Sequence, residues 1–370
     1  MTARRRILGV TGSRAEFGLL EPVFRAISER SELELCVAVA GAHLLPPGHT
    51  AAEVRRAFPV VAEVAMQTAG TSTRMSDAIA FGRGALGFAQ TIDALRPDAV
   101  LVLGDRIEAF AAASAAAIAG VRVAHMHGGD RAEGVADESM RHAISKLAHL
   151  HLPATEASAE RLRRMGEDDD RIAVVGSPAI DGLDDMPAID DATFDRLGRP
   201  EILVLLHPTG RDDEVEALCA AALYAACIAA GRTLALRPNA DPGAGGVLRA
   251  LADSGLRTEA HLPRRDFVGL LRRVRLLAGN SSAGLIEAAA LRTRVLNVGS
   301  RQAGRERAAN VVDVPGWDRE ALGFAVRRAL EMPSPPPNHP YGDGRAGVRT
   351  AELLAGDALG RVTIAKRNRY

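Results

Sequence analysis

Short apolar segments alternate with longer segments rich in Ala, Leu and Arg along almost the whole chain. The apolar segments are continuous rather than alternating with polar residues, which predicts strands that helices cover on both faces. In the first half these strands are expected at Arg6–Val10, Leu33–Ala40, Ala99–Leu103, Val121–His125 and Ile172–Val175. In the second half they are expected at Ile202–Leu206, Thr233–Leu236, Leu276–Ala278 and Val295–Val298. The alternation predicts an α/β protein with parallel sheets.

The segment from about Ser177 to Pro200 interrupts this pattern with prolines and with the acidic run Asp181–Asp185. Such a composition is typical of a hinge or linker between domains. We therefore expect two doubly wound, Rossmann-like domains, at 1–178 and 179–350. Two such domains that face one another have a natural ligand cleft, because strand carboxyl ends and helix N-termini point into it.

The composition narrows the class of protein. The 370 residues include 46 basic and 46 acidic side chains, and 47% of the residues are hydrophobic. This balance excludes extensive disorder and disfavours a nucleic-acid binder, which needs concentrated positive charge. No apolar run approaches the roughly 20 residues that span a bilayer, and the apolar stretch near the start is too short for a signal peptide. Three cysteines without a CxxC spacing fit reduced thiols. We expect a cytoplasmic protein without membrane or nucleic-acid partners.

The first candidate site follows the first strand, in the sequence VTGSRAEFG at 10–18. Gly12 permits a tight turn, and Ser13 and Arg14 lie where a helix N-terminus could bind an anion. The sequence matches neither GxGxxG nor a P-loop, which disfavours a conventional dinucleotide or ATP site. An ordinary turn between a strand and a helix explains these residues equally well.

A second candidate lies at the end of another expected strand, where Gly104 is followed by Asp105 and Arg106. This position places both charged side chains at the edge of the expected cleft, where the protein can tune the pKa of a carboxylate. The alternative is that Asp105 simply caps the helix that follows.

The densest group of polar residues comprises HMHGGD at 125–130 and DESMRH at 137–142. In a strand, His125 and His127 project to the same face, and in a helix Asp137 and Arg141 lie one turn apart. So many ionisable side chains are costly to bury unless they line a polar cleft.

The His-x-His spacing also raises the question of a zinc site, since histidines and a carboxylate are suitable ligands. No HExxH or Cys/His spacing accompanies it, so we expect no metal. His149 and His151, farther along the chain, are interpreted as packed, hydrogen-bonded histidines.

In the second half, the sequence GNSSAGLIE at 279–287 predicts a turn of small residues that opens a helix. Its free backbone N–H groups and the hydroxyls of Ser281 and Ser282 suit a diphosphate. Glu287, farther along the same helix, could accept hydrogen bonds from a ribose diol. The loop at 299–305 offers guanidinium groups to the phosphates.

These motifs together resemble those of the UDP-N-acetylglucosamine 2-epimerase family, in particular its hydrolysing, sialic-acid-type branch. The HMHGG form indicates that branch, because non-hydrolysing relatives have a glutamate in place of the second histidine. The matches cover nearly the whole chain. In order they are TGSRAEFG (11–18), GAHL (41–44), GDRIEA (104–109), HMHGGD (125–130), DESMRHAISKLAHLH (137–151), VGSPAID (175–181), HPTG (207–210), PNAD (238–241), GNSSAGLIEA (279–288) and GSRQAGRERAANVVDV (299–314).

The resemblance implies a glycosyltransferase-B-like fold, in which a C-terminal helix within 351–370 crosses back to the first domain. The sequence itself predicts this helix from about Thr350 to Ile364. The implied reaction cleaves UDP-N-acetylglucosamine to UDP and N-acetylmannosamine. UDP is eliminated to give a 2-acetamidoglucal, and water then adds with inverted configuration at C2. No cofactor takes part, and we expect a homo-oligomer, either a dimer or a tetramer.

The resemblance also implies roles for individual residues. The catalytic positions match Asp105, His127, Asp137, Glu138, Arg141 and His207. The carboxylates in this set are acid/base candidates and Arg141 supports them, while His127 is a base, a proton relay or an orienting group. The positions expected to bind the nucleotide sugar are Arg14, His43, Asn239, Asp241, Ser281, Ser282, Gly284, Glu287 and Arg301.

Other functions share the fold or the chemistry. The same elimination could act on GDP-N-acetylglucosamine or on a UDP-2,4-diacetamido-2,4,6-trideoxy sugar. A glycosyltransferase has the same fold, but the carboxylates and histidines at 105–142 argue against it. A non-catalytic nucleotide-sugar sensor would keep the residues at 279–305 and lose the acid/base set at 105–141, which is present here.

Overall fold

The computed structural model describes residues 4–46, 50–70, 73–132, 138–239, 241–356, 359–360 and 363–367. The chain divides into two compact units. Unit 1 contains residues 1–130, 137–181 and 341–370, and unit 2 contains residues 131–136 and 182–340. The main part of unit 2 therefore begins after Asp181 and ends before Tyr341.

Unit 1 is built on a parallel six-stranded sheet with the order β3-β2-β1-β4-β5-β6. Its strands are β1 (Arg5–Thr11), β2 (Leu33–Ala40), β3 (Val60–Val64), β4 (Ala99–Leu103), β5 (Arg122–Met126) and β6 (Leu150–Leu152). Its α-helices are α1 (Arg14–Ser28), α2 (Ala51–Ala57), α3 (Arg74–Leu95), α4 (Ile107–Ile118), α5 (Glu138–Leu147), α6 (Glu156–Arg164) and α14 (Ala346–Ala355). This is the order of a doubly wound sheet, and it brings the carboxyl ends of β1, β4 and β5 to one edge.

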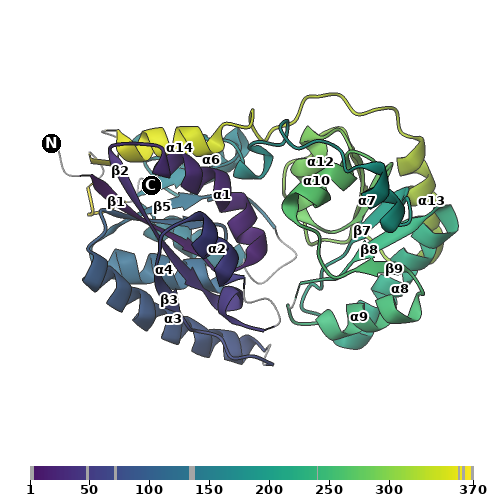
Figure 1. The fold of residues 1–370 in the computed structure, drawn as a ribbon, viewed down its shortest axis with the longest axis horizontal. Helices are drawn as coiled ribbons and strands as arrows, with labels where there is room; N and C mark the ends of the chain where they lie inside the picture. Colours follow the sequence, from purple (N-terminus) through teal and green to yellow (C-terminus); the bar gives the residue numbers. More distant parts are fainter. Residues whose placement is uncertain are drawn as a thin grey trace. The chain divides into compact units, whose positions relative to one another are not determined.

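Alternate residues of the central strands enter two separate cores, one on each face of this sheet. Ile7 of β1 packs with residues of α1 and α14, whereas Leu8 packs with residues of α3 and α4. Figure 1 shows α1 and α14 over one face and α3 and α4 over the other. Burial on both faces explains why the central strands are continuous apolar runs in the sequence.

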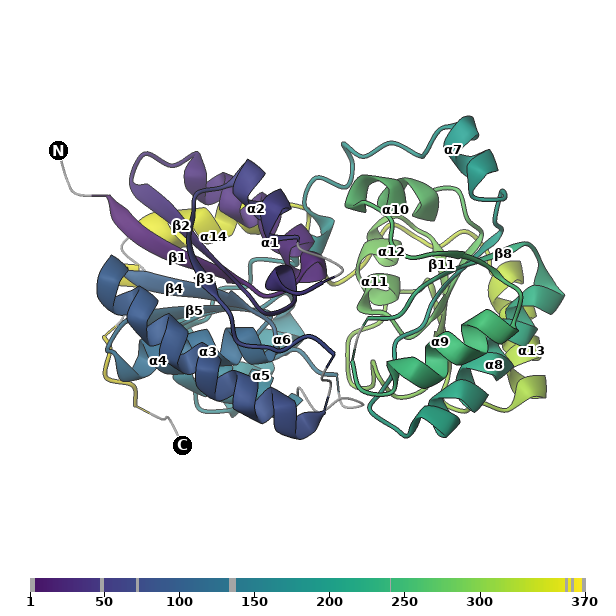
Figure 2. The same ribbon diagram turned by 60° about the horizontal axis from the view of Figure 1, so that its bottom comes forward.

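Unit 2 repeats the scheme with the strand order β12-β11-β10-β7-β8-β9, again parallel. Its strands are β7 (Ile202–Leu205), β8 (Thr233–Leu236), β9 (Arg257–Glu259), β10 (Leu276–Gly279), β11 (Arg294–Val298) and β12 (Val311–Val314). Its α-helices are α7 (Asp191–Arg196), α8 (Asp213–Ala230), α9 (Ala244–Asp253), α10 (Arg264–Leu271), α11 (Ser282–Leu285), α12 (Glu287–Ala290) and α13 (Arg319–Glu331). Helices α8, α9 and α13 cover one face of the sheet, and α10 and α12 cover the other (Figure 2). The predicted α/β class, with two doubly wound parallel sheets, is confirmed.

The strand prediction was wrong at the edges of the sheets. Ile172–Val175 is not a strand: among the described residues, Ile172 forms an isolated bridge with His151. Strands β3, β6, β9 and β12 were not predicted. In three of them, β3, β9 and β12, half or more of the residues are at least partly exposed, as expected where one side of a strand has no neighbour. Without full burial, such strands lack the apolar run that identifies a central strand.

The last helix also differs from its prediction. Helix α14 begins at Ala346 and ends at Ala355, instead of extending from about Thr350 to Ile364. Its start is determined by Asp181, whose carboxylate accepts hydrogen bonds from the Ala346 and Gly347 N–H groups at 3.0 and 2.6 Å. This cap comes from a residue far away in the sequence, which local periodicity does not reveal.

None of the helices in the described part of the chain combines the length and apolar character that crossing a membrane requires.

Candidate active site

Asp105 lies at the carboxyl end of β4, in a turn that Gly104 makes possible. Gly104 has a φ of +73°, a conformation that favours glycine. The next helix, α4, has Arg106 and not Asp105 at its N-cap position. The structure therefore disagrees with the alternative in which Asp105 caps that helix. Its carboxylate instead contacts Arg141 of α5.

Arg141 joins the two carboxylates at this edge of the unit 1 sheet. Its side chain is only 3% exposed. One guanidinium nitrogen donates to Asp105, and the other donates to Glu138 Oε2 at 2.5 Å and to the Asp130 backbone oxygen at 3.1 Å. The side chains of Asp105 and Glu138 remain 22% and 18% exposed, so both carboxylates reach solvent beside a buried cation. Asp137, the third predicted carboxylate, lies outside the described residues.

His127 lies just after β5 and is held by two protein groups. Its Nδ1 is 2.8 Å from Asp130 Oδ2, and its Nε2 is 3.1 Å from Ser177 Oγ. Because an ionised carboxylate only accepts hydrogen bonds, Nδ1 carries a proton. Asp130 is oriented in turn by the Ser158 hydroxyl at 2.8 Å. These contacts hold the ring in one orientation.

The expectation that His125 and His127 project to the same face does not hold. Strand β5 ends at Met126, and His127 has a φ of +61°, so strand alternation no longer applies to it. His125 Nε2 donates to the Gly104 backbone oxygen at 2.8 Å, and its Nδ1 accepts from Ser145 Oγ at 3.2 Å. Burial lowers the pKa of His125 to about 3. A neutral His125 thus links the turn before Asp105 to helix α5.

His149 and His151 are also held by hydrogen bonds. His149 Nδ1 accepts from the Val123 N–H at 3.1 Å, and its Nε2 donates to the Ile364 backbone oxygen at 3.2 Å. His151 Nε2 is 2.9 Å from Glu167 Oε2. Among the described residues, no group of three or more His, Cys, Asp or Glu side chains is arranged to hold a metal ion.

The turn after β1 brings His43 close to Gly12 but leaves Arg14 at the surface. His43 is fully buried between Thr11 Oγ1 at 3.0 Å and Thr50 Oγ1 at 2.7 Å, and burial lowers its pKa to about 4. Arg14 is about one-third exposed and pairs with Glu53 at 3.1 Å. A phosphate at this turn would therefore compete with Glu53 for Arg14.

Two buried glutamates beside this turn were missed by sequence reasoning. Glu16 accepts the Gly12 N–H at 2.5 Å, and burial raises its pKa to about 7. Glu108 is completely buried, and a side chain at Gly12 or Gly41 would collide with it. Both acids closely follow a predicted strand, in TGSRAE and GDRIE. That position was the signal that could have revealed them.

In unit 2, His207 follows β7 and is organised by Asn280, which was not predicted as a site residue. The Asn280 side chain accepts the His207 N–H and donates to the His207 carbonyl, both at 2.8 Å. The Asn239 N–H donates to His207 Nδ1 at 3.3 Å, so the neutral ring has its proton on Nε2. Burial, followed by the nearby charge of Arg301, lowers the His207 pKa to about 3. His207 is thus a neutral donor.

The serine turn in unit 2 differs from its prediction in one respect. Ser281 caps α11, and its Oγ accepts from the Ala283 N–H at 3.4 Å. The helix is interrupted at Ile286, so Glu287 begins the separate helix α12. Glu287 is buried and lies 3.6 Å from Arg264.

The remaining predicted residues of unit 2 have close protein neighbours. Gly284 packs on the sheet, where an added Cβ would lie 3.0 Å from Val295 Cγ1. Arg301 donates to the Asn280 carbonyl at 3.2 Å, next to His207. The Asn239 side chain donates to the Asp241 carboxylate. Arg301 and Asn239 thus lie beside His207, whereas Gly284 has a packing role.

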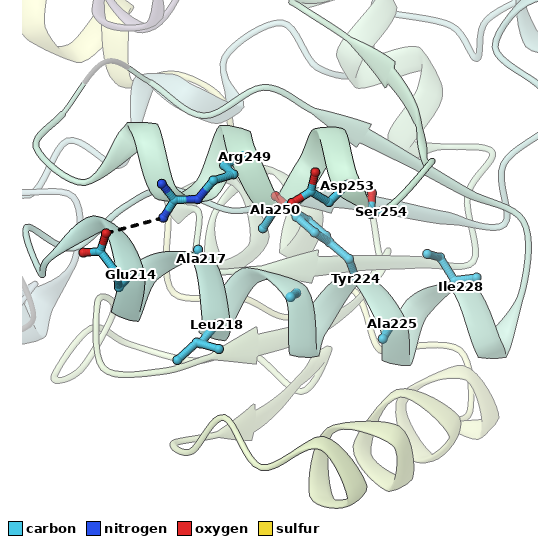
Figure 3. Close-up of a pocket in the computed structure, with 11 residues that line it drawn as sticks. Glu214, Ala217, Leu218, Tyr224, Ala225, Ile228, Arg249, Ala250, Asp253 and Ser254 are labelled. Carbon is cyan, nitrogen blue, oxygen red and sulfur yellow. Dashed lines mark ion pairs between the residues drawn. The ribbon is translucent and has the colours of Figure 1, made fainter.

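A hollow on the surface of unit 2 lies between α8 and α9 (Figure 3). Arg249 and Glu214 lie 3.9 Å apart at one end of it, and Leu218 and Ile228 lie along it. The described residues that line it are mainly aliphatic and include no predicted site residue. In each unit, the polar cluster at the strand carboxyl ends is therefore the candidate functional region.

Two doubly wound parallel sheets, each with polar side chains where its strands end, define a GT-B-type α/β protein. The family model described as UDP-N-acetylglucosamine 2-epimerase matches residues 25–355, and the chain belongs to this family.

Individual relatives extend this result. The chain is 36% identical to UDP-N,N'-diacetylbacillosamine 2-epimerase (hydrolyzing) of Legionella pneumophila, over 99% of this chain and 100% of that protein. It is 29% identical to UDP-N-acetylglucosamine 2-epimerase of Neisseria meningitidis serogroup B, over 98% of each. The structure of S. aureus MnaA with UDP shares the fold, with a TM-score of 0.79 at 21% identity over 99% of this chain and 100% of that one.

Proposed function

We propose that this protein is a hydrolysing 2-epimerase, which releases UDP from a UDP-linked 2-acetamido sugar and inverts the configuration at C2. The observation that carries the proposal is the buried Arg141, which joins Asp105 and Glu138 at the carboxyl edge of a parallel sheet. Elimination requires a base for the C2 proton, and hydration requires a proton to be returned. Two carboxylates that share one guanidinium are suited to divide these tasks.

Within unit 1, we assign the proton transfers to Asp105 and Glu138, with Asp137 as a further candidate. Arg141 keeps the two described carboxylates in place through hydrogen bonds from separate nitrogens. His127 then has an orienting role, since both of its ring nitrogens contact protein groups. This assignment selects one of the three roles that the sequence left open for His127.

Unit 2 is proposed to bind the nucleotide. The neutral His207 offers its Nε2 proton, and Arg301 offers a guanidinium, to the diphosphate. The hydroxyls of Ser281 and Ser282 add donors, and Glu287 accepts from the ribose. Charge that develops on departing UDP would be stabilised by these donors without a metal ion.

Two UDP sugars are candidate substrates. UDP-N-acetylglucosamine is the substrate that the sequence motifs imply. The 36% identity to a hydrolysing epimerase named for UDP-N,N'-diacetylbacillosamine, against 29% to one named for UDP-N-acetylglucosamine, favours the 2,4-diacetamido sugar. We therefore propose a UDP-linked 2,4-diacetamido-2,4,6-trideoxy sugar as the preferred substrate.

The test is incubation of the protein with each UDP sugar in deuterated water, followed by NMR. We expect free UDP and a free sugar with inverted C2 that carries deuterium at C2, because that proton is removed and replaced. Retention of the original hydrogen at C2 would exclude the elimination. Release of UDP from neither sugar would favour a sensor or another substrate, and faster release from UDP-N-acetylglucosamine would reverse the preference.

A further inference from the structure

The chain has only two lysines, Lys146 and Lys366, among 46 basic residues, and both contact the same buried carboxylate. Lys146 Nζ lies 2.6 Å from Glu167 Oε1, and Lys366 Nζ lies 2.6 Å from Glu167 Oε2. His151 Nε2 contacts Glu167 Oε2 at 2.9 Å. Burial opposes ionisation of Glu167, but hydrogen bonds from His151 and the two lysines outweigh it and lower its pKa to about 2.

Lys366 also binds the carboxyl end of helix α5. Its Nζ donates to the backbone oxygens of Ser145, Lys146 and Ala148, at 3.3, 2.9 and 2.5 Å. The last carbonyl groups of a helix have no partner within the helix, and a cation near them is favoured by the helix dipole. Lys366 therefore satisfies three carbonyls at the end of the helix that begins with Glu138.

Two further contacts hold the segment 363–367 in place. The Ile364 carbonyl accepts from His149 Nε2 at 3.2 Å, and Thr363 Oγ1 accepts from Arg171 at 3.0 Å. His149 and His151, which the proposed chemistry does not use, thus help to dock the chain's own C-terminal segment beside β6.

Helix α5 connects this docking site to the acid/base group. It has ten residues, with Glu138 and Arg141 in its first half and Ser145 in its second. The Ser145 carbonyl accepts from Lys366 and its hydroxyl contacts His125, which donates to the carbonyl of Gly104 next to Asp105. A shift of α5 along its axis would therefore alter both sides of the Arg141–Asp105 contact.

We propose that Lys366 is a positioning residue: by binding Glu167 and the carboxyl end of α5, it holds Arg141 and Glu138 in register with Asp105. The catalytic part of this inference rests on the proposed epimerase function. Its structural part, that Lys366 holds α5 in place, does not.

The experiment compares wild type with Lys366→Met. Hydrogen exchange monitored by mass spectrometry should show about tenfold faster exchange in α5, because three carbonyl contacts and a favourable charge are lost. Turnover should fall on the order of tenfold with little change in KM, because misplaced catalytic groups impair the chemical step more than binding. The affinity for UDP, which we assign to unit 2, should not change.

Arg5→Met is the matched control. Arg5 caps α14 in the same way, with one nitrogen 2.8, 3.0 and 2.6 Å from the Leu354, Ala355 and Gly356 carbonyls. Its loss should speed exchange in α14 and leave turnover per folded molecule unchanged. A merely stabilising role for Lys366 would give this same pattern, with exchange affected and turnover preserved, and would overturn the proposal.

If the methionine variant does not fold, Lys366→Gln replaces it in the experiment, because the glutamine keeps a hydrogen-bond donor without the charge. Lys366→Gln should also show faster exchange in α5 and lower turnover, both to a smaller degree. Unchanged exchange in α5 in a folded Lys366 variant would also reject the proposal. If wild type turns over neither UDP sugar, the proposed function fails, while the exchange experiment still tests whether Lys366 holds α5.

Discussion

Asp130 Oδ2 lies 2.8 Å from His127 Nδ1, and this contact determines which nitrogen of the imidazole carries the proton. The ring's other nitrogen contacts Ser177 at 3.1 Å. An imidazole whose Nδ1 donates to a carboxylate and whose Nε2 contacts a hydroxyl is held in one orientation and one tautomer. We therefore expect His127 to orient the proposed site, and Asp105 and Glu138 to transfer the protons.

We predict that His127→Gln lowers kcat by only about tenfold, because the amide can keep one of the two hydrogen bonds that orient the site. An amide cannot accept a proton, so the same variant would lose far more activity if His127 were the base. Single-turnover release of UDP measures the effect. Ser177→Ala, which removes only the contact to Nε2, should have a smaller effect. A loss of about a thousandfold or more in His127→Gln would instead identify His127 as the base.

Asp105→Asn should lower kcat by about a hundredfold or more with little change in UDP affinity, because the amide cannot transfer the proton and the residues proposed to bind the nucleotide lie in unit 2. Asp98→Asn is the control: Asp98 precedes the same strand and accepts the Arg6 N–H at 2.7 Å, far along the strand from Asp105. Its kcat should be unchanged. Parallel losses of turnover and UDP affinity in Asp105→Asn would indicate a binding role.

Glu287→Ala should weaken UDP binding by about tenfold and leave the affinity for inorganic pyrophosphate unchanged, because only the proposed ribose contact is lost. Calorimetry with both ligands measures this. Glu201→Ala provides the comparison, since Glu201 also pairs with arginines, Arg232 and Arg275, but at the amino end of β7. Equal weakening for both ligands in Glu287→Ala would place Glu287 near the phosphates.

The buried His125 should make the protein less stable in acid. Its pKa is lowered from 6.5 to about 3, so below pH 6.5 the unfolded chain binds a proton that the folded chain does not. The stabilisation is complete above pH 6.5 and is lost as the pH falls towards 3, at up to about 1.4 kcal/mol per pH unit. Urea unfolding at several pH values gives the free energy of unfolding as a function of pH. Between pH 3 and 6.5 this free energy should fall less steeply with decreasing pH in His125→Asn than in wild type. Identical slopes would contradict the prediction.

Glu16 should act in the opposite direction. Its pKa is raised from 4.5 to about 7, so between these values the folded chain holds a proton that the unfolded chain has lost. Its contribution to stability is complete below pH 4.5 and declines as the pH rises through 7. Glu16→Gln should remove this decline, and the variant should gain stability relative to wild type between pH 5 and 8. Urea unfolding at several pH values tests this prediction. A difference in the free energy of unfolding between variant and wild type that does not change with pH would refute it.

The central strands could be predicted because both of their faces are buried, which imposes a continuous apolar run that is visible in the sequence. The edge strands β3, β9 and β12 could not, since partial exposure removes that constraint. The start of α14 was missed for a different reason. It depends on Asp181, which lies far away along the chain.

Several candidate site residues could be identified from position alone. Asp105 and His207 directly follow strands, and Ser281 opens a helix after a strand, so the parallel topology places them at the carboxyl edges of the two sheets. Asn280 was overlooked, because its role consists of hydrogen bonds to the backbone of His207. Nothing in its local sequence distinguishes that role from an ordinary turn.

The sequence by itself determined the α/β class, the two doubly wound sheets and the residue types at the ends of their strands. Burial requires apolar runs and tight turns require particular residues, and both are visible in the local sequence. Only the tertiary structure decided which of those residues meet. Arg141 reaches Asp105, His127 contacts Ser177, and Lys366 joins Glu167 and α5. Their protonation and orientation depend on burial and on partners distant in the chain, and neither is set until the chain has folded.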